Sequence, residues 1–374
     1  MTSICLNMIV KNEAHVITRC LASVKPLIDS WVIVDTGSTD GTQDIIRTFL
    51  SDIPGELHEK PWIDFGHNRT EAIALAQGYG QYLLIIDADD TLSLPHPFTR
   101  PKLTADAYAI EVIYGTTRFW RTHLFRSDLD FYFSGVIHEG LHSIEKRDSK
   151  RLAEIQYLCL GGGARSHDPK KYYRDAAILE SALAKDPSNT RYAFYLAQSW
   201  RDAGEFEKAI LAYENRVNMQ GWEEEVYYSL HEIAALSVKI QCDDATIIDR
   251  FLRAYAYRPT RAEPLCNVAA FLRQQDRAAA AYPFALAATH IMQPADTLFV
   301  DNSVYQWRAL DEYGVAAYWS HRYQEAITAN EQLLSNPLLP DDQRQRIEKN
   351  LVFSREKCNA VHPTLAASGS CEAN

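Results

Sequence analysis

A short apolar run near residue 85 ends in three closely spaced aspartates. The run closes with Ile86, and the aspartates that follow are Asp87, Asp89 and Asp90. Carboxylate oxygens are the ligands that Mg²⁺ and Mn²⁺ prefer, and these ions in turn carry diphosphates. Acidic clusters also occur in helix caps and solvated loops. Taken alone, the cluster is therefore a weak indication of a divalent-metal site.

The position of the cluster strengthens that indication. Residues 83–86 are consecutive aliphatic residues, which fits a parallel strand covered on both faces. In open α/β sheets, ligands bind outside the carboxyl ends of such strands. We therefore expect the aspartates at a ligand-binding edge of a sheet.

Polar residues follow an earlier expected strand in the same way. An apolar run that begins at Ile4 turns polar at Asn12 and Glu13, and a helix is expected over residues 14–24. Glu13 could equally be a residue of the first helical turn, where the helix dipole favours an acid.

A second expected strand, over residues 31–34, ends at Asp35 and is followed by a polar loop with Gly37. A helix is expected over 43–50 after that loop. The alternation of strands and helices predicts a right-handed, doubly wound parallel sheet whose strand ends gather the polar clusters at one edge.

Four motifs, in this order along the chain, resemble those of family 2 glycosyltransferases of the GT-A fold. They span residues 8–14, 34–42, 65–69 and 86–90. The resemblance extends over about residues 3–140 and is closer to the subgroup with tetratricopeptide repeats behind the catalytic domain, which includes peptide glycosyltransferases. It implies an α/β GT-A domain, similar to a Rossmann domain, followed by an all-α tetratricopeptide-like domain.

The resemblance also implies an activity. An enzyme of this kind moves a sugar, with inversion and with a divalent metal ion, from a nucleotide-sugar donor to an acceptor hydroxyl or thiol. We expect a UDP-sugar as donor, Mn²⁺ or Mg²⁺ as cofactor, and a peptide, a glycan or a small molecule as acceptor.

The same resemblance assigns residues to the donor pocket. The expected donor-binding residues are Asn12, Glu13, Asp35, Gly37, Asn68, Arg69 and Asp87. Besides Glu13, two of them have simpler alternatives. Asp35 could cap the loop after it as an Asx-turn, and Arg69 could be a helix-start arginine paired with Glu71.

Asp87 and Asp89 are the expected metal residues. In the resembling family the last aspartate of this motif ligates the metal, while the first more often touches the ribose or a metal-bound water. The metal neutralises the diphosphate leaving group. His167, beside three consecutive glycines, and His138 are further candidate ligands.

An aromatic segment over residues 131–133 leads to His138 and Glu139, where the resembling family places its acceptor-side acidic motif. Glu139 is the expected general base. His138 is its partner, a substitute base or a third metal ligand. The simpler alternative is a surface histidine–glutamate pair that closes a turn.

The chain becomes helical near Pro169, and a repeat emerges. Small and aromatic residues recur at the spacing of a tetratricopeptide unit; the clearest copy contains Leu196, Ala197, Trp200, Gly204, Phe206, Ala209 and Tyr213. Small residues there let two helices approach closely, and stacked hairpins bury a continuous core. An unrelated α-helical domain is the alternative. We expect the repeats to bind the acceptor or to form a homodimer.

These patterns predict a catalytic domain over 1–167, a helical repeat domain over 168–360 and a disordered tail over 361–374. A chain of 374 residues with 47% hydrophobic content suits two domains, and a net charge of -11 argues against a nucleic-acid partner. Seven scattered cysteines without a Cys-x-x-Cys pair support neither a disulfide framework nor a zinc ribbon. Because we find no signal-peptide pattern and no long apolar stretch, we expect a cytoplasmic protein.

Two other functions compete with this interpretation. A nucleotidyltransferase also uses strand-tip carboxylates, but it needs a glycine-rich phosphate loop that residues 8–13 lack. A helical scaffold with a decayed front domain would have lost some of Asp35, Arg69, Asp87 and Asp89, and all four are present.

Overall fold

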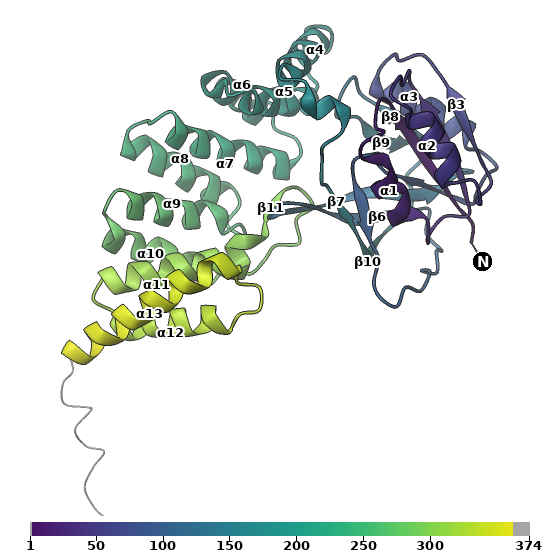
Figure 1. Cartoon of the computed structure of the whole chain (residues 1–374). Helices are drawn as coiled ribbons and strands as arrows, with labels where there is room; N and C mark the ends of the chain where they lie inside the picture. The colour runs from purple at the N-terminus through teal and green to yellow at the C-terminus, as the bar shows by residue number, and fades with distance from the viewer. Residues whose placement is uncertain (1, 362–374) are drawn as a thin grey trace, which may run out of the picture. The chain divides into compact units, whose positions relative to one another are not determined.

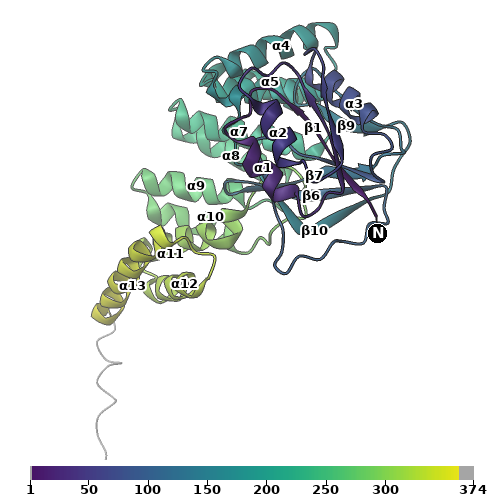
Figure 2. The same cartoon turned by 45° about the vertical axis from the view of Figure 1, so that its right-hand side comes forward.

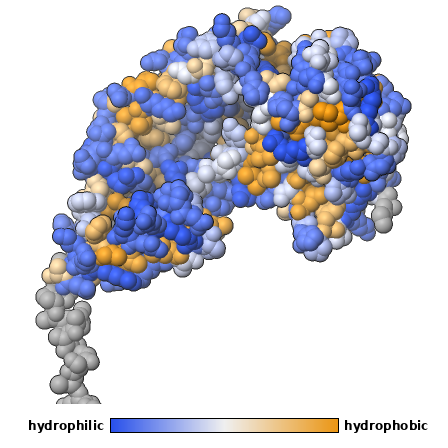
Figure 3. Space-filling view, viewed as in Figure 1, coloured by the Kyte–Doolittle hydropathy of each residue, from blue (hydrophilic) through white to orange (hydrophobic). Residues whose placement is uncertain are grey.

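The computed structural model describes residues 2–361, and an α/β region precedes a long series of helices (Figure 1). The expected disordered tail lies outside the described residues apart from Val361, which ends helix α13 (Asp341–Val361). Among residues 2–361, no helix has both the length and the apolar character needed to span a bilayer. Hydrophilic residues cover much of the visible face of the helical segment (Figure 3).

Four parallel strands form one half of the main sheet. They are β1 (Ile4–Val10), β2 (Ser30–Asp35), β3 (Gly55–Glu59) and β4 (Tyr82–Ile85), in the spatial order β3-β2-β1-β4. Every residue of β2 and β4 is buried, as expected for parallel strands covered on both faces. The doubly wound fold predicted from the sequence is confirmed for this half.

Helices cover both faces of these strands. Helices α1 (Ile17–Val24) and α2 (Thr42–Phe49) lie together on one face, where Leu21 and Ile46 share a core with alternate residues of β1 (Figure 2). Helix α3 (Phe65–Leu75) packs on the other face, where Ile73 shares a second core with β4. Asn7 of β1 points toward α3 and donates hydrogen bonds to Ala72 O (2.9 Å) and Val32 O (3.2 Å).

The other half of the sheet is mixed rather than parallel. Strand β7 (Thr117–Arg126) runs antiparallel to β4 and to β6 (Ala107–Tyr114), followed by β10 (Ser149–Leu158) and the short β5 (Thr91–Ser93). A tight turn at Gly115, whose φ is +57°, joins β6 to β7 and forces the antiparallel pairing. A separate hairpin consists of β8 (Phe131–Ser134) and β9 (Gly140–Ser143).

The helical half of the chain begins with the 3₁₀ turn η1 (Ala164–His167). Its start agrees with the predicted change near Pro169. The helices that follow are α4 (Lys171–Lys185), α5 (Thr190–Asp202), α6 (Phe206–Asn218), α7 (Glu223–Lys239), α8 (Asp244–Tyr257), α9 (Glu263–Gln274), α10 (Ala278–Thr289), α11 (Ala309–Trp319), α12 (Tyr323–Ser335) and α13, with a π-helical turn, η2 (Val304–Arg308), before α11 and a two-residue strand, β11 (Val300–Asp301), before η2. Within the first compact unit α4 packs on α5 and α5 on α6, and within the second α8 to α13 pack in succession. The predicted small residues Ala197 and Ala209 are fully buried where α5 meets α6.

The chain forms two compact units. The first comprises Met1–Glu225 with Thr297–Phe299, and the second comprises Val226–Asp296 with Val300–Asn374. Helices α4, α5 and α6 thus belong to the same compact unit as the sheet. The boundary between 167 and 168 marks the change of secondary structure, and as a domain boundary it stays a prediction.

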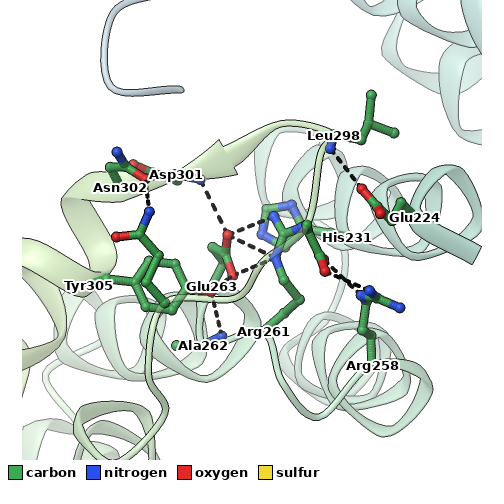
Figure 4. Close-up of polar contacts among 12 residues, drawn as sticks. Glu224, His231, Arg258, Arg261, Ala262, Glu263, Leu298, Asp301, Asn302 and Tyr305 are labelled. Carbon is green, nitrogen blue, oxygen red and sulfur yellow. Dashed lines mark hydrogen bonds and ion pairs between the residues drawn. The ribbon is translucent and has the colours of Figure 1, made fainter. Parts of the chain in front are cut away.

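The second unit contains a buried network of charges (Figure 4). Arg261, with 2% of its side chain exposed, pairs with Glu263 (2.7 Å) and Asp296 (3.0 Å). Tyr305 donates a hydrogen bond to Glu263 (2.6 Å), and Arg258 pairs with Asp296 (2.5 Å). The network joins the start of α9 to the segment before η2. Removing one member would leave a charge buried without its partner.

We predict that Glu263→Ala lowers the free energy of unfolding of the second unit by about 3–5 kcal/mol, because Arg261 stays buried without its main partner. Urea denaturation monitored by hydrogen exchange of α9 peptides measures the loss. The control is Asp244→Ala, which removes a half-exposed pair with Arg277 (3.2 Å) and should cost less than ~1 kcal/mol. Equal losses in both variants would show that the buried network contributes no more to the free energy of unfolding than an exposed ion pair does.

Candidate active site

Parallel pairing brings the expected acidic motifs to one edge of the sheet. Asp35 ends β2 beside Val10 of β1, and β4 runs parallel to β1 on its other side, with Asp87 just beyond its end. The predicted gathering of these motifs at strand ends therefore follows from the observed register.

Asp35 is fully buried, and its two carboxylate oxygens have different surroundings. Oδ1 accepts hydrogen bonds from Gly37 N (2.9 Å), Ser38 N (2.8 Å) and Gln43 Nε2 (3.0 Å), which is the Asx-turn arrangement. Oδ2 has no hydrogen-bond partner among the described residues. Burial opposes ionisation, but hydrogen bonds from Ser38, Gln43 and Gly37 keep the pKa of Asp35 below its usual value. Oδ1 of Asp35 therefore caps the turn, while Oδ2 remains available to accept a hydrogen bond from an N–H or O–H group of a ligand.

Asn12 and Glu13 at the end of β1 hold the loop after β2. Asn12 has a left-handed backbone (φ +58°), and its Oδ1 accepts a hydrogen bond from Thr39 N (2.8 Å). The backbone N–H of Glu13 donates to Thr42 Oγ1 (2.8 Å). Gly37, expected in the donor pocket, is exposed in the same loop with φ +105°.

A glycine loop covers two carboxylates of the acidic edge. Asp89 Oδ2 accepts a hydrogen bond from Gly163 N (3.0 Å), and the Glu13 carboxylate accepts one from Ala164 N (3.3 Å). A Cβ atom on Gly163 would lie 2.8 Å from Asp89 Oδ2 and 3.1 Å from Glu13 Oε1. Only glycine lets the backbone come this close to both carboxylates.

Crowding of negative charge is evident at this edge. Burial, reinforced by Asp89 and Asp40, raises the pKa of Glu13 to about 7. Burial, together with the charges of Asp87 and Asp89, raises the pKa of Asp90 to about 6. Asp90 is buried and anchors the start of the glycine loop, since it accepts hydrogen bonds from Tyr157 Oη (2.8 Å) and Leu160 N (3.0 Å).

The acidic edge suits a divalent ion that the donor helps to hold. Within residues 2–361, no three or more His, Cys, Asp or Glu side chains form a ready-made metal cage. Mg²⁺ in nucleotide enzymes, however, takes only one or two protein carboxylates and completes its shell with water and phosphate oxygens. Asp89, in a region of excess negative charge, fits such a ligand.

Arg69 is buried and joins the acidic motif to the expected base. Its Nη2 pairs with Asp87 Oδ1, and its Nε lies 2.5 Å from Glu139 Oε1. Arg69 and Arg121 outweigh the effect of burial and lower the pKa of Asp87 to about 2. The alternative pairing of Arg69 with Glu71 is wrong, because Glu71 pairs with Lys60 (3.3 Å) and the guanidinium turns inward to the two carboxylates.

Asn68 holds a loop instead of facing the edge. Its side chain is fully buried; Oδ1 accepts a hydrogen bond from Ile63 N (2.9 Å), and Nδ2 donates one to Pro61 O (3.0 Å). This geometry gives no support to the expected donor contact of Asn68, which stays a prediction.

Glu139 and His138 occupy the turn between β8 and β9. The Glu139 side chain is 10% exposed, so it is a largely enclosed acid rather than an exposed one. The His138 ring stacks on Tyr195 of α5, with the ring centroids 4.2 Å apart. Partial burial and the nearby cations Arg165 and Arg191 lower the pKa of His138, so the ring is neutral at neutral pH. The other candidate histidine, His167, lies with its ring centroid 5.6 Å from that of His15.

Several residues of this region escaped prediction. They come from segments without a recognisable motif: Arg19 of α1, Arg121 of β7, Tyr157 of β10, and Arg191 and Tyr195 of α5. Arg19 donates a hydrogen bond to Asp89 O (2.5 Å), and Arg121 lies 3.9 Å from Asp87. Each meets the site through a contact distant in sequence, so no local spacing could have revealed it.

Known proteins resemble parts of this chain. Residues 5–96 match the family model described as Glycosyl transferase family 2. The chain is 33% identical over 152 residues to a TPR repeat-containing protein of Synechococcus elongatus, covering 37% of this chain and 35% of that protein. It is 24% identical over 225 residues to the SPbeta prophage-derived glycosyltransferase SunS of Bacillus subtilis, covering 56% and 51%. The chain thus spans about a third to a half of the length of these relatives.

Two solved structures match parts of this chain at low identity and low TM-score. The S. aureus TarS 1-349 structure in complex with UDP is 14% identical, covers 64% of this chain and 92% of that chain, and has a TM-score of 0.36. The TPR protein YrrB, described as having an unusual peptide-binding site, is 11% identical, covers 51% and 95%, and has a TM-score of 0.36.

We predict that the thermal stability of the protein in EDTA falls as pH rises through about 7. A carboxyl whose pKa is raised on folding binds a proton more tightly in the folded state, so its stabilising effect is present below the unfolded pKa and lost as pH rises through the folded one. Glu13→Gln should remove this slope and raise the melting temperature at alkaline pH. The control is Glu59→Gln, on an exposed part of β3; the same flattening in both variants would contradict the assignment to Glu13.

Proposed function

We propose, from the match of residues 5–96 to the model of glycosyltransferase family 2, that the chain transfers a sugar from a UDP-sugar to an acceptor hydroxyl or thiol with inversion of the anomeric carbon. The observation that carries the proposal is the placement of three carboxylates at one edge of the sheet: Asp35 ends β2, and Asp87 and Asp89 follow β4, on the two sides of β1. The unpartnered, ionised Oδ2 of Asp35 supports a contact with the nucleotide.

The donor pocket is proposed to lie between the ends of β1, β2 and β4. Asp35 accepts a hydrogen bond from the base or the ribose, and Asn12 holds the loop with Gly37 against which the nucleotide lies. A divalent ion, Mn²⁺ or Mg²⁺, held by Asp89 with help from Asp87 and by the donor diphosphate, would neutralise the charge of the leaving group.

Glu139 is proposed as the general base. It accepts the proton of the acceptor hydroxyl or thiol while the acceptor atom forms its bond to the anomeric carbon from the side opposite the UDP, and the bond to the diphosphate oxygen breaks. Arg69 orients Glu139 through the 2.5 Å contact, and the low exposure of both side chains limits competing water. His138, neutral and stacked, shapes the acceptor side of the turn.

The acceptor is proposed to be recognised through the helical segment, as a peptide, a glycan or a small molecule. Within the second unit, a pocket of about 550 Å³ has Gln306, Gln324, Gln332 and Trp307 among its lining residues. Amide side chains can pair with the backbone of an extended peptide, which favours a peptide among these acceptors. A homodimer through the repeats is the other role proposed for these helices.

The defining test measures release of UDP from UDP-glucose, UDP-galactose and UDP-N-acetylglucosamine with Mn²⁺ or Mg²⁺. Mass spectrometry of candidate acceptors incubated with the active donor then identifies the product. Failure to bind UDP in the presence of either metal ion, together with no UDP release from any donor, would overturn the proposal.

We predict that UDP with Mn²⁺ raises the melting temperature of the wild type and that Asp89→Asn loses the metal-dependent part of this rise, because the amide cannot replace the charged ligand. Asp89→Asn should also abolish UDP release. Asp52→Asn, an exposed acid paired with Lys25, is the control. A nucleotide-induced rise of the same size in EDTA would exclude metal dependence.

We predict that Glu139→Gln lowers kcat at least about a hundredfold while the KM for the donor changes little, since a base acts mainly in the transition state. Steady-state kinetics with the active UDP-sugar separates the two constants. Glu145→Gln, an exposed acid just after β9, is the control. A parallel loss of donor affinity would move Glu139 from the base to the donor pocket.

A further inference from the structure

The turn that carries Glu139 has a backbone conformation that needs support. Gly135 has φ +125°, and His138 has φ +51°, a left-handed value that residues with a Cβ rarely adopt. Such conformations persist where surrounding contacts hold them, and they concentrate at functional sites. The turn is short, so its conformation fixes the direction of the Glu139 side chain.

Helix α3 holds one side of this turn. A Cβ atom on Gly66 would lie 2.7 Å from Gly135 O, so the helix backbone touches the turn directly. Thr70 Oγ1 donates a hydrogen bond to Phe133 O (3.0 Å) and accepts one from Phe133 N (2.9 Å). Together with the pairing of Arg69 and Glu139, these contacts fix the turn on the side of the sheet.

Helix α5 holds the other side, through two residues one helical turn apart. Arg191 donates hydrogen bonds from Nε (2.9 Å) and Nη2 (2.7 Å) to the carbonyl oxygen of His138. Tyr195 stacks on the His138 ring at 4.2 Å with an angle of only 6° between the planes. The Arg191 guanidinium lies 4.9 Å from the centre of the Tyr195 ring. Arg191 and Tyr195 together clamp His138, the residue whose backbone is left-handed.

Arg191 and Tyr195 lie outside the most buried face of α5. The buried face of α5 is formed by Ala193, Phe194 and Ala197, whereas Arg191 and Tyr195 are only partly buried. Loss of either clamp residue therefore leaves the hydrophobic contacts of the helix in place.

We propose that Arg191 and Tyr195 of α5 are positioning residues of the catalytic site, which hold the turn at His138 so that Glu139 faces the acceptor. The inference rests on the proposed function of Glu139. It makes the second helix of the helical segment an integral part of the catalytic site, and a chain that ended before α5 would lack this support.

Hydrogen–deuterium exchange of the full chain tests the clamp without any substrate. In Arg191→Ala and Tyr195→Leu, amides of residues 135–140 should exchange at least about tenfold faster than in the wild type, while peptides over β4 and residues 87–90 should be unchanged. Tyr195→Phe keeps the ring and should behave as the wild type. Arg174→Ala, which removes an exposed pair with Asp168 (2.7 Å), is the control. Unchanged exchange at the turn in both variants would overturn the proposal even if the protein transfers no sugar.

Kinetics supplies the second readout. With a UDP-sugar that the wild type hydrolyses, Arg191→Ala and Tyr195→Leu should lower kcat by about tenfold to a hundredfold with an unchanged donor KM, and Tyr195→Phe should restore the rate. Wild-type kcat in the first two variants would refute the positioning role. Absence of UDP release by the wild type would instead count against the proposed function, and the exchange measurement alone would then decide on the clamp.

Discussion

The buried guanidinium of Arg69 is the interaction on which the arrangement of this site depends. It contacts Asp87 beyond the end of β4 and Glu139 in the β8–β9 turn, two segments about 50 residues apart in the chain. Because a desolvated cation needs its partners, loss of either carboxylate would cost about 3–5 kcal/mol. The same cation therefore links the donor edge of the site to its acceptor side.

Much of the first half could be predicted from the sequence because its signals are local. Apolar runs that end in Asp35 or Asp87 indicate buried strands with polar ends, and parallel pairing then brings those ends together without further information. The confirmed helices α1 and α2 follow from the same alternation. The helical character of the second half was also predictable, because small residues such as Ala197 and Ala209 recur at the spacing of closely packed helices.

The rest depends on contacts between distant segments, which spacing does not encode. Nothing near Arg69 indicates that it turns away from Glu71 toward Glu139, and nothing near Tyr195 points to His138. The antiparallel half of the sheet escaped prediction because the tight turn at Gly115 has no strong hairpin signature. The domain boundary was drawn where strands give way to helices, whereas compactness groups α4, α5 and α6 with the sheet.

The glycine loop that connects β10 to η1 has a consequence for protein engineering. It is fastened at several points: His15 contacts Gly162 O (2.6 Å), Arg19 contacts Gly161 O (3.2 Å), and Gly163 N contacts Asp89. A connection bound in this way is not a neutral splice point. A chimaera that exchanges helical repeats between related chains should keep everything from the sheet through α6 from one parent and place its crossover after that helix.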